Sequence, residues 1–314
     1  MRLPSLATLS SVLVLLLSAF LHAQSGDLQK IIIDTDVGDD VDDAFAIALA
    51  LRSPELRILG ISTTFGDTET RAKLLDRFLG EVGRQDIPVV AGTPTGAGGN
   101  FTQRRYAEGG NFAKASHPPA TDFILEQIRR NPGEITLIAI GPLGNVGALI
   151  DKDPETFRKL HQVVLMGGSI SRRYGDLGYA PPRGPEAEWN IKSDIPSAQK
   201  LFSSGAPISM MPLDSTQLKL DEVKRSILFQ TGTPITDALT ILYYQWGQQT
   251  PTLFDVMTIA YILDPKLCPI TPVHITIDPQ GFTRPGAGAP NAQVCLDSNS
   301  ETFFRFVLPR LTSP

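Results

Sequence analysis

The chain has 314 residues, with 28 Lys and Arg against 33 Asp and Glu, and a net charge of −5 at pH 7. This length is sufficient for one large α/β domain with a full hydrophobic core. The acidic balance disfavours nucleic acid as a partner, because proteins that bind phosphate backbones carry basic patches. The basic pairs Arg104-Arg105, Arg129-Arg130 and Arg172-Arg173 are short and scattered, and we interpret them as solvated.

The first 23 residues have the pattern of a secretory signal peptide. Arg2 precedes an apolar stretch at 13–21, and Leu21-His22-Ala23 is an acceptable cleavage site. The stretch is short and interrupted by Ser, which disfavours a spanning helix, although an uncleaved membrane anchor is the alternative. We expect a mature domain over residues 24–314, periplasmic or secreted, with no membrane association after cleavage. Loss of Arg2 changes its net charge to −6.

Strand-like and helix-like segments alternate through the first two thirds of the chain. The expected strands are 30–34, 56–63, 88–91, 135–140, 162–166 and 208–211. The expected helices between them are 41–52, 69–82, 120–130, 143–151 and 194–204. This alternation predicts an α/β fold with a mostly parallel central sheet flanked by helices. The last third adds helices near 221–229, 234–247 and 255–263, strands near 272–278 and 291–297, and a closing helix near 300–310.

Two long polar segments interrupt this rhythm, residues 92–119 and residues 167–189. Both follow expected strands, so both should project from the same rim of the sheet. Loops of this length in a compact domain are usually lids or binding loops. The alternative is an ordinary surface excursion.

Six carboxylates fall within ten residues at the end of the first expected strand. They are Asp34, Asp36, Asp39, Asp40, Asp42 and Asp43. In open α/β folds, the junction between the carboxyl end of a strand and the following helix is where ligands bind. Helix capping explains one or two acids, with Asp40 as a plain N-cap, but not six. The cluster therefore predicts a bound hard cation with oxygen ligands.

Cysteine and histidine provide weaker signals. Cys268 and Cys295 could form a disulfide in an oxidising compartment, but the sequence alone leaves this open. Neither cysteine has the spacing of a zinc site. Three histidines, His117, His161 and His274, remain after signal removal, which disfavours a His-ligated transition metal.

The acid cluster is accompanied by four further motifs. They are the run 63–68 (TTFGDT), the run 138–145 (IAIGPLGN), the run 163–168 (VVLMGG) followed by 188–191 (EWNI), and Phe254-Asp255 at the start of a helix. Together with the opening D-T-D-x-G-x-D-x-D-D-A, they resemble the nucleoside hydrolase family, the calcium-dependent N-ribohydrolases. The match runs in order from Lys30 to the C-terminal helix, and the longer opening motif resembles a bacterial branch of the family.

The resemblance implies a Ca²⁺ site at the carboxyl-terminal rim of the sheet. Its implied ligands are Asp36, Asp43, the carbonyl of Ile140 and Asp255. A mixture of carboxylate, carbonyl and water oxygens suits calcium, which takes six to eight oxygen ligands.

The chemistry implied by the resemblance is hydrolysis of the C1′–N bond of a nucleoside or related N-riboside. A calcium-bound water would attack, and Asp36 would act as general base. Asp42, Glu188 and Asn190 would bind the ribose hydroxyls, and Asp67 would face the sugar. The aromatic side chains of Phe65, Tyr106 and Trp189 are candidates for the base pocket, or alternatively core residues.

Two departures from the familiar family motif bear on function. The paired acids lie two residues further along than in D-x-D-P-G-x-D-D, which leaves open whether Asp40 or Asp42 binds the ribose. Phe254 stands where inosine–uridine-type members carry a His thought to protonate the leaving base. The identity of the base, the nature of the sugar and formation of a homo-oligomer are left open.

Two other functions compete. A calcium-dependent nucleoside or sugar-binding protein without turnover is favoured by Phe254. A magnesium-dependent phosphohydrolase resembling the haloacid dehalogenases fits the run 34–37 (DTDV), with Asp34 as nucleophile, but does not explain Asp42 and Asp43.

Overall fold

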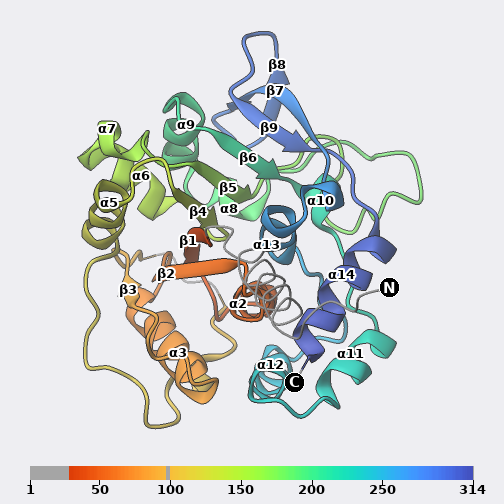
Figure 1. The fold of residues 1–314 in the computed structure, drawn as a ribbon. Coiled ribbons are helices and arrows are strands. Elements are labelled where there is room, and N and C mark those ends of the chain that lie inside the picture. Colours follow the sequence, from red (N-terminus) through yellow and green to blue (C-terminus); the bar gives the residue numbers. More distant parts are fainter. Residues whose placement is uncertain (1–27, 97–99, 314) are drawn as a thin grey trace, which may run out of the picture.

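The computed structural model describes residues 28–96 and 100–313. Within them lies a nine-stranded sheet with the order β3-β2-β1-β4-β5-β6-β9-β7-β8 (Figure 1). The first seven strands in this order, β3 through β9, run parallel to one another. The last two, β7 and β8, are antiparallel to their neighbours and form one edge of the sheet. The expected signal peptide, residues 1–23, lies outside the described residues.

The element bounds follow the hydrophobic pattern closely. The strands are β1 (Gln29–Thr35), β2 (Leu56–Thr63), β3 (Val89–Ala91), β4 (Ile135–Ala139), β5 (Gln162–Met166), β6 (Ile208–Met211), β7 (Ile270–Ile277), β8 (Thr283–Gly286) and β9 (Ala292–Cys295). The longer helices are α2 (Asp42–Leu51), α3 (Thr68–Glu81), α5 (Ala120–Arg130), α6 (Gly144–Lys152), α9 (Ile195–Ser203), α11 (Glu222–Phe229), α12 (Pro234–Trp246), α13 (Val256–Leu263) and α14 (Ser300–Thr312). All of the expected strands and helices are confirmed, most to within one or two residues.

Six short elements were not expected from the sequence. They are α4 (Arg104–Ala107), α7 (Pro154–Phe157), α8 (Trp189–Lys192), α10 (Leu213–Thr216), the 3-10 helix η1 (Pro265–Leu267) and the strand β8. A single helical turn or a four-residue edge strand contains too few apolar positions to show a period of its own. The long segment 92–119 contains α4, and α8 begins where the segment 167–189 ends.

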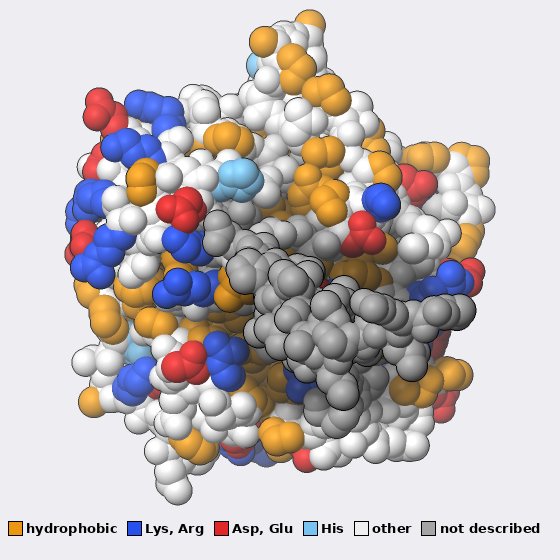
Figure 2. All heavy atoms as spheres, in the orientation of Figure 1, with side chains coloured by type: hydrophobic (Ala, Val, Ile, Leu, Met, Phe, Trp, Pro, Cys, Tyr) orange, Lys and Arg blue, Asp and Glu red, His pale blue; other side chains and the backbone are white. Residues whose placement is uncertain are grey.

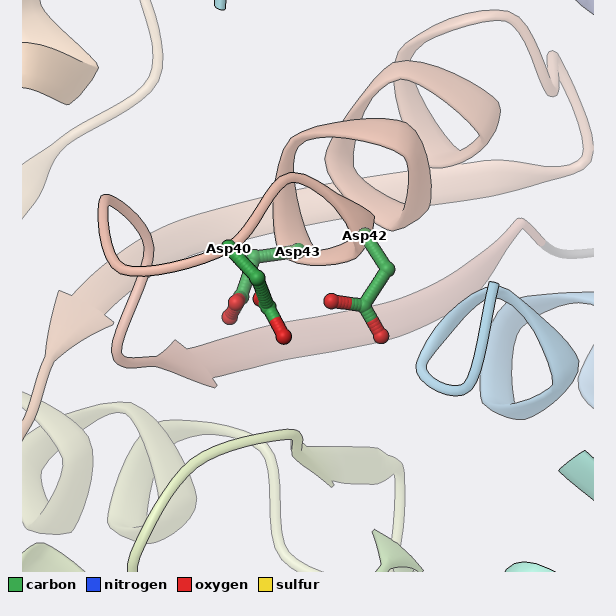
Figure 3. Close-up of side chains that lie close together, drawn as sticks. All are labelled: Asp40, Asp42 and Asp43. Atoms are coloured by element: carbon green, nitrogen blue, oxygen red, sulfur yellow. The ribbon is translucent and has the colours of Figure 1, made fainter. Parts of the chain in front are cut away.

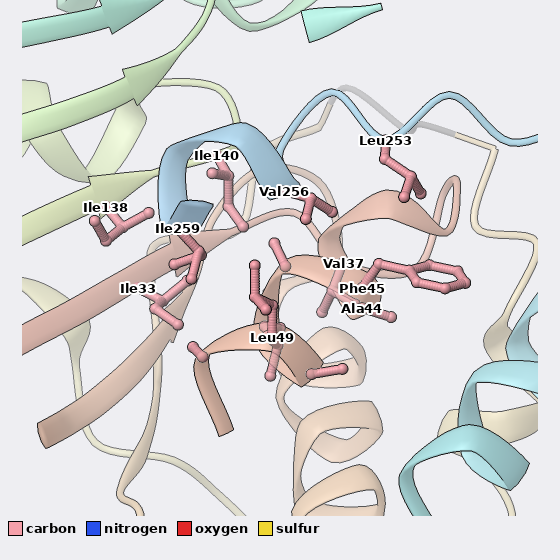
Figure 4. Close-up of a cluster of buried hydrophobic side chains, with 14 of the residues drawn as sticks. Ile33, Val37, Ala44, Phe45, Leu49, Ile138, Ile140, Leu253, Val256 and Ile259 are labelled. Carbon is pink, nitrogen blue, oxygen red and sulfur yellow. The ribbon is translucent and has the colours of Figure 1, made fainter. Parts of the chain in front are cut away.

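Two hydrophobic cores lie on opposite faces of the sheet. In β1, Ile31 and Ile33 pack into one core while Ile32 packs into the other, because successive side chains of a strand point to opposite faces. The first core contains α2 and α13, and Figure 4 shows Phe45 and Leu49 of α2 in the same cluster as Val256 and Ile259 of α13. The second core contains α5, α6 and α9. Both faces of the sheet are therefore covered, as a parallel sheet requires.

Cys268 and Cys295 form a disulfide with 5.5 Å between their Cα atoms. Cys268 follows α13 and Cys295 ends β9, and both side chains are fully buried. The bond ties the segment that follows α13 to the end of β9, inside the sheet. The sequence left this pairing open, because it does not give the distance between the two cysteines.

The surface carries charges of both signs. On the face shown in Figure 2, Lys and Arg side chains lie among Asp and Glu side chains, most densely over α5, α6 and α7. Several are paired there, as in Arg129–Asp153 at 2.8 Å. Among residues 28–96 and 100–313, no helix has the length and apolar content needed to cross a bilayer.

Candidate functional site

A pocket of about 300 Å³ opens at the carboxyl ends of the parallel strands. Side chains from the β1–α2 turn, the segment 92–119, the segment 167–189 and the start of α13 meet there. Its lining residues are Asp36, Asp39, Asp40, Asp42, Asp43, Asn100, Thr102, Ile140, Met166, Tyr174, Glu188, Trp189, Asn190, Trp246, Gln248, Phe254 and Asp255. Both long segments therefore contribute to this pocket, as expected for binding loops.

Three carboxylates converge closely within the pocket. One oxygen from each of Asp40, Asp42 and Asp43 lies within 4.8 Å of the others. Figure 3 shows the three side chains extending to the same side from the β1–α2 turn and the first turn of α2. Asp36, Asp255 and Ile140 line the same pocket. This set offers carboxylate and carbonyl oxygens, which fits a hard cation such as calcium.

Burial makes this acid cluster costly without a positive charge. It raises the pKa of Asp36 to about 8, with Arg71 opposing the shift and Asp40 and Asp39 adding to it. Burial also raises the pKa values of Asp42, Asp43 and Asp255 well above their usual range, and the charges of neighbouring acids, Asp36 and Asp40 included, raise them further. Charged carboxylates buried side by side need a compensating cation.

Hydrogen bonds hold the acids at the start of α2. The Thr35 hydroxyl donates to the carboxylate of Asp43, and the backbone N–H of Asp255 donates to the carboxylate of Asp42 at 3.2 Å. The second bond joins α2 to the start of α13, two elements far apart in sequence. It explains how Asp255 comes to lie beside Asp42 and Asp43.

Arg71 of α3 is a buried cation beneath the acidic turn, and no sequence motif predicted it. Its guanidinium forms an ion pair with Asp39 at 2.9 Å and donates to the backbone carbonyls of Asp36, Val37 and Phe65. Only 1% of the side chain is exposed. Asp39 is thus neutralised by the protein itself, and Arg71 fixes the backbone from which Asp36 projects.

The segment 100–103 clamps the same turn from the other side. The Thr102 hydroxyl donates to the Asp39 carbonyl at 2.8 Å, and the Gln103 side chain donates to the Asp40 carbonyl. The Phe101 ring packs onto Gly38, whose φ is +124°, so that a Cβ there would lie 2.2 Å from the ring. Glycine is therefore required at position 38 both for its conformation and for this close approach.

Asp34 has a structural position rather than one in the pocket. It is 2% exposed, and its carboxylate accepts hydrogen bonds from Ser62 at 2.6 Å and from Asn145 at 2.7 Å. These bonds join the ends of β1 and β2 to the start of α6. Asp34 does not contact the pocket, which removes the basis for a nucleophilic role in the phosphohydrolase alternative.

Glu188 and Asn190 lie in the pocket wall, as predicted. The Glu188 carboxylate caps α8 by accepting hydrogen bonds from the backbone N–H groups of Asn190 and Ile191, at 2.9 and 3.1 Å. It also accepts from the Gly168 N–H and the Tyr174 hydroxyl. The Asn190 amide donates to the carbonyl of Met166 at 3.1 Å. These bonds orient both side chains before any ligand binds.

Asp67 is not among the residues that line the pocket, contrary to its predicted place facing the sugar. Its carboxylate caps α3 through Thr70 and pairs with Arg104 at 3.1 Å. Although burial opposes the shift, these hydrogen bonds lower the pKa of Asp67. The structure supports a capping role for this acid.

The aromatic candidates have different positions. Trp189 lines the pocket. The Phe65 ring contacts the Trp189 ring edge-on, with 5.7 Å between the ring centroids. Tyr106 is fully buried, donates to Glu81 at 2.5 Å and takes no part in the pocket. Tyr174 and Phe254, which also line the pocket, meet edge-on at 5.8 Å. No motif predicted Asn100, Thr102, Tyr174, Trp246 or Gln248; Trp246 ends α12, and the other four lie in connecting segments.

His117 lies outside the pocket and anchors the end of the segment 92–119. Its ring nitrogens contact Glu69 at 2.8 Å and Asp76 at 3.0 Å, both on α3. The Lys114 ammonium also pairs with Asp76, at 3.2 Å. Burial opposes the charged ring, but the hydrogen bonds to Asp76 and Glu69 outweigh it and raise the pKa of His117. The protonated ring therefore ties the segment to α3.

We expect this contact to make stability depend on pH. Because the folded-state pKa is raised, the stabilisation is fully present below the unfolded pKa of about 6.5 and is lost as pH rises through the folded value. His117→Asn should lower the free energy of unfolding by about 1–3 kcal/mol at pH 6 and by less at pH 9. Thermal unfolding at both pH values measures the difference. His161→Asn, at an exposed site, is the control. A deficit independent of pH would contradict the ion pair.

Comparison with known proteins identifies the class of enzyme that this fold and pocket define. The family model for inosine-uridine preferring nucleoside hydrolases matches residues 31–305. The chain therefore belongs to the nucleoside hydrolase family and is a hydrolase that acts on N-glycosyl compounds. The expected family resemblance and fold class are confirmed.

Individual relatives agree. The chain is 30% identical over 315 residues to the pyrimidine-specific ribonucleoside hydrolase RihA of Citrobacter koseri, covering 90% of this chain and 97% of the relative. A plant nucleoside hydrolase, the PpNRh1 enzyme, superimposes with a TM-score of 0.78 at 25% identity, covering 91% of this chain and 100% of that one. A purine-preferring ribonucleoside hydrolase from Gardnerella vaginalis shares the fold, with a TM-score of 0.76 at 23% identity and coverage of 90% and 98%.

Proposed function

We propose that the enzyme hydrolyses the N-glycosidic bond of a ribonucleoside or related N-riboside with the aid of Ca²⁺ and an Asp general base. The observation that carries this proposal is the convergence of Asp36, Asp40, Asp42, Asp43 and Asp255 on one pocket that Ile140 also lines. Such a set of oxygen ligands fits calcium, and its buried acids fit the stabilisation of a positively charged sugar.

The metal ligands in this proposal are Asp36, Asp43, Asp255 and the carbonyl of Ile140. When bound, calcium would act as a Lewis acid that lowers the pKa of a coordinated water. The three acids with the closest approach are instead Asp40, Asp42 and Asp43. Asp40 is exposed whereas Asp42 is 3% exposed and fixed by Asp255, so we assign the binding of ribose to Asp42, with Asp40 as a second contact.

The protein's own side chains would divide the remaining work. Asp36 would accept the proton of the attacking water, since its carboxylate lines the pocket and its backbone is held by Arg71. Asn190 and Glu188 would contact ribose hydroxyls from the opposite wall. The acids around the sugar would stabilise the oxocarbenium-like transition state by their negative charge.

Calcium should stabilise the purified mature protein against heat. A ligand that binds only the folded state stabilises it by mass action, by about 2.7 kcal/mol at 100 times Kd, which corresponds to about 5–10 °C in Tm. Differential scanning calorimetry with calcium and with a chelator measures this shift. Asp43→Asn and Asp255→Asn should reduce it.

Asp40→Asn is the matched control, because it removes an acid of the same cluster that is not an assigned ligand. If the rise in Tm caused by calcium is lost in Asp40→Asn but retained in Asp255→Asn, the calcium ligands are instead Asp40, Asp42 and Asp43. Melting and activity that are both unchanged by the chelator would overturn the metal assignment.

A secreted binder without turnover is the second candidate, and Phe254 is the feature that favours it. Calorimetry that detects nucleoside binding, combined with no release of reducing sugar from a nucleoside panel that includes nicotinamide riboside, would support it. Sugar release by the wild type above that of Asp36→Asn would exclude it.

We also propose that the protein is exported, as the signal-like residues 1–23 indicate. The buried disulfide Cys268–Cys295 supports export, because disulfides persist in oxidising compartments. Mass spectrometry of protein exported by its native host should give a new amino terminus near Gln24 and a mass that rises by about 2 Da on reduction. An intact Met1 would contradict export.

A further inference from the structure

A second cavity adjoins the pocket on the side of Phe254. It has a volume of about 230 Å³ and shares Asp40, Asp42, Trp246, Gln248 and Phe254 with the pocket. Beyond them it is lined by Val41, Lys219, Thr250, Pro251 and Thr252. The two cavities thus lie side by side, with Asp36, Asp43 and Asp255 lining only the first and Lys219 lining only the second.

The backbone around Lys219 directs its side chain into this second cavity. Residues 218–220 pair with residues 251–253 through hydrogen bonds from Leu220 N–H to the Pro251 carbonyl and from Leu253 N–H to the Leu218 carbonyl, both 2.9 Å. Leu218 and Leu220 are buried in the core, so alternation along the chain turns Lys219 to the other side. The paired segment leads directly into Phe254 and Asp255, which fixes Lys219 relative to the acids.

Lys219 shares its cavity with Asp40 and Asp42 but is not directly paired with either. Within the described residues it forms no ion pair, whereas the nearby Lys224 pairs with Asp221. Lys219 is half-buried, and the cavity around it combines the flat rings of Trp246 and Phe254 with the amide of Gln248. These groups suit a planar, polar ring that carries or develops negative charge.

We propose that Lys219 faces the departing group and stabilises the negative charge that develops on it, so that the enzyme favours substrates with anionic leaving groups. This inference rests on the proposed N-riboside hydrolysis. With the sugar at the acidic end, the attached group extends past Phe254 toward Lys219. Phe254 has no proton to donate to the leaving group. The ammonium of Lys219 can stabilise negative charge on the leaving group without transferring a proton to it.

The reaction balances as follows. The C1′–N bond breaks with its electron pair passing to the nitrogen of the base, and the water oxygen bonds to C1′ while Asp36 takes the water proton. The base leaves as an anion paired with Lys219, which keeps its own proton, and the anion is protonated by solvent after release. With p-nitrophenyl riboside the bond broken is C1′–O and p-nitrophenolate leaves. With cationic nicotinamide riboside, the electron pair of the C1′–N bond passes to the positively charged ring nitrogen, and neutral nicotinamide leaves.

These last two substrates separate the effect of Lys219 from general damage. Lys219→Gln should lower kcat/KM for p-nitrophenyl riboside by roughly 10- to 100-fold, the range for loss of a charged hydrogen-bond partner. It should leave kcat/KM for nicotinamide riboside unchanged or raise it, because an ammonium repels a cationic substrate. Lys219→Arg should retain most of the wild-type ratio between the two substrates.

Lys266→Gln, at an exposed position, is the matched control and should leave both rates unchanged. Equal effects of Lys219→Gln on both substrates, or no effect on either, would overturn the inference. Wild-type protein that cleaves neither substrate would overturn the proposed function instead. In that case, calorimetric titration in the presence of calcium still tests the role of Lys219. Lys219→Gln should bind nicotinamide riboside more tightly than the wild type does, with no change for uridine. Unchanged affinity for both ligands would refute the role of Lys219.

Discussion

Asp36→Asn is expected to lower kcat by about 10²–10⁴-fold, the usual loss when a general base is removed. The binding of ribose should change far less, since Asn190, Glu188 and Asp42 would still contact the sugar. The structure supports this division because Asp36 follows β1 directly, lines the pocket and is held through its backbone by Arg71. Single-turnover kinetics and ribose affinity, both measured at saturating calcium, separate the two effects.

Reduced folding stability would not account for such a loss. Asp36 is buried among like charges, and its raised pKa means that the charged form destabilises the calcium-free protein. Asp36→Asn should therefore melt no lower than the wild type when calcium is absent. A decrease in kcat of only a few-fold would move the role of general base to Asp40, and Asp40→Asn would then show the large loss.

p-Nitrophenyl riboside should be hydrolysed about 10²–10⁴-fold faster than inosine, because leaving-group protonation contributes that much to difficult departures. Phe254 occupies the pocket wall and has no proton to donate. The histidines do not replace it: His117 contacts Glu69 and Asp76, and His274 contacts the Ala289 carbonyl. Lys219 stabilises an anion but leaves it unprotonated, so the preference for a good leaving group persists.

Phe254→His tests the cause of this preference. The new imidazole should raise kcat on inosine and change kcat on p-nitrophenyl riboside little, since that substrate needs no acid. Phe254→Leu is the control for altered packing against Tyr174, which contacts the Phe254 ring at 5.8 Å. Equal and fast rates of the wild type on both substrates would show that another group already serves as the acid.

Local patterns predicted the sheet because its strands are short apolar runs between turns. Lys30 to Asp34 and Gln162 to Met166 are examples, and the structure extends the first by one residue at each end and keeps the second. The acidic pocket could also be predicted, since the carboxyl ends of parallel strands meet at one edge of a sheet. Asp42 and Asp43 line the pocket for this reason, whereas Asp255 precedes α13 and is held there by the hydrogen bond from its N–H to Asp42.

The remaining features depend on contacts between distant parts of the chain. Arg71 has the sequence context of an ordinary helix residue, and only folding brings its guanidinium beneath Asp39. Asp67 follows a strand as Asp36 does, but a nearby Thr70 and Arg104 turn its carboxylate into a helix cap. Lys219 and Gln248 lie in connecting segments, where no periodicity indicates which side chain faces a cavity.

The two ends of the pocket are carried by different kinds of segment. Asp36 and Asp43 lie where β1 leads into α2, whereas Lys219 and Gln248 lie in connections between helices. Connecting segments tolerate substitution and changes of length better than the elements they join. Substitutions at Lys219 and Gln248 that keep the buried Leu218 and Leu220 would therefore change which leaving group is accepted while leaving the acids in place. The fold thus offers a scaffold on which substrate range can be changed independently of the bond-breaking chemistry.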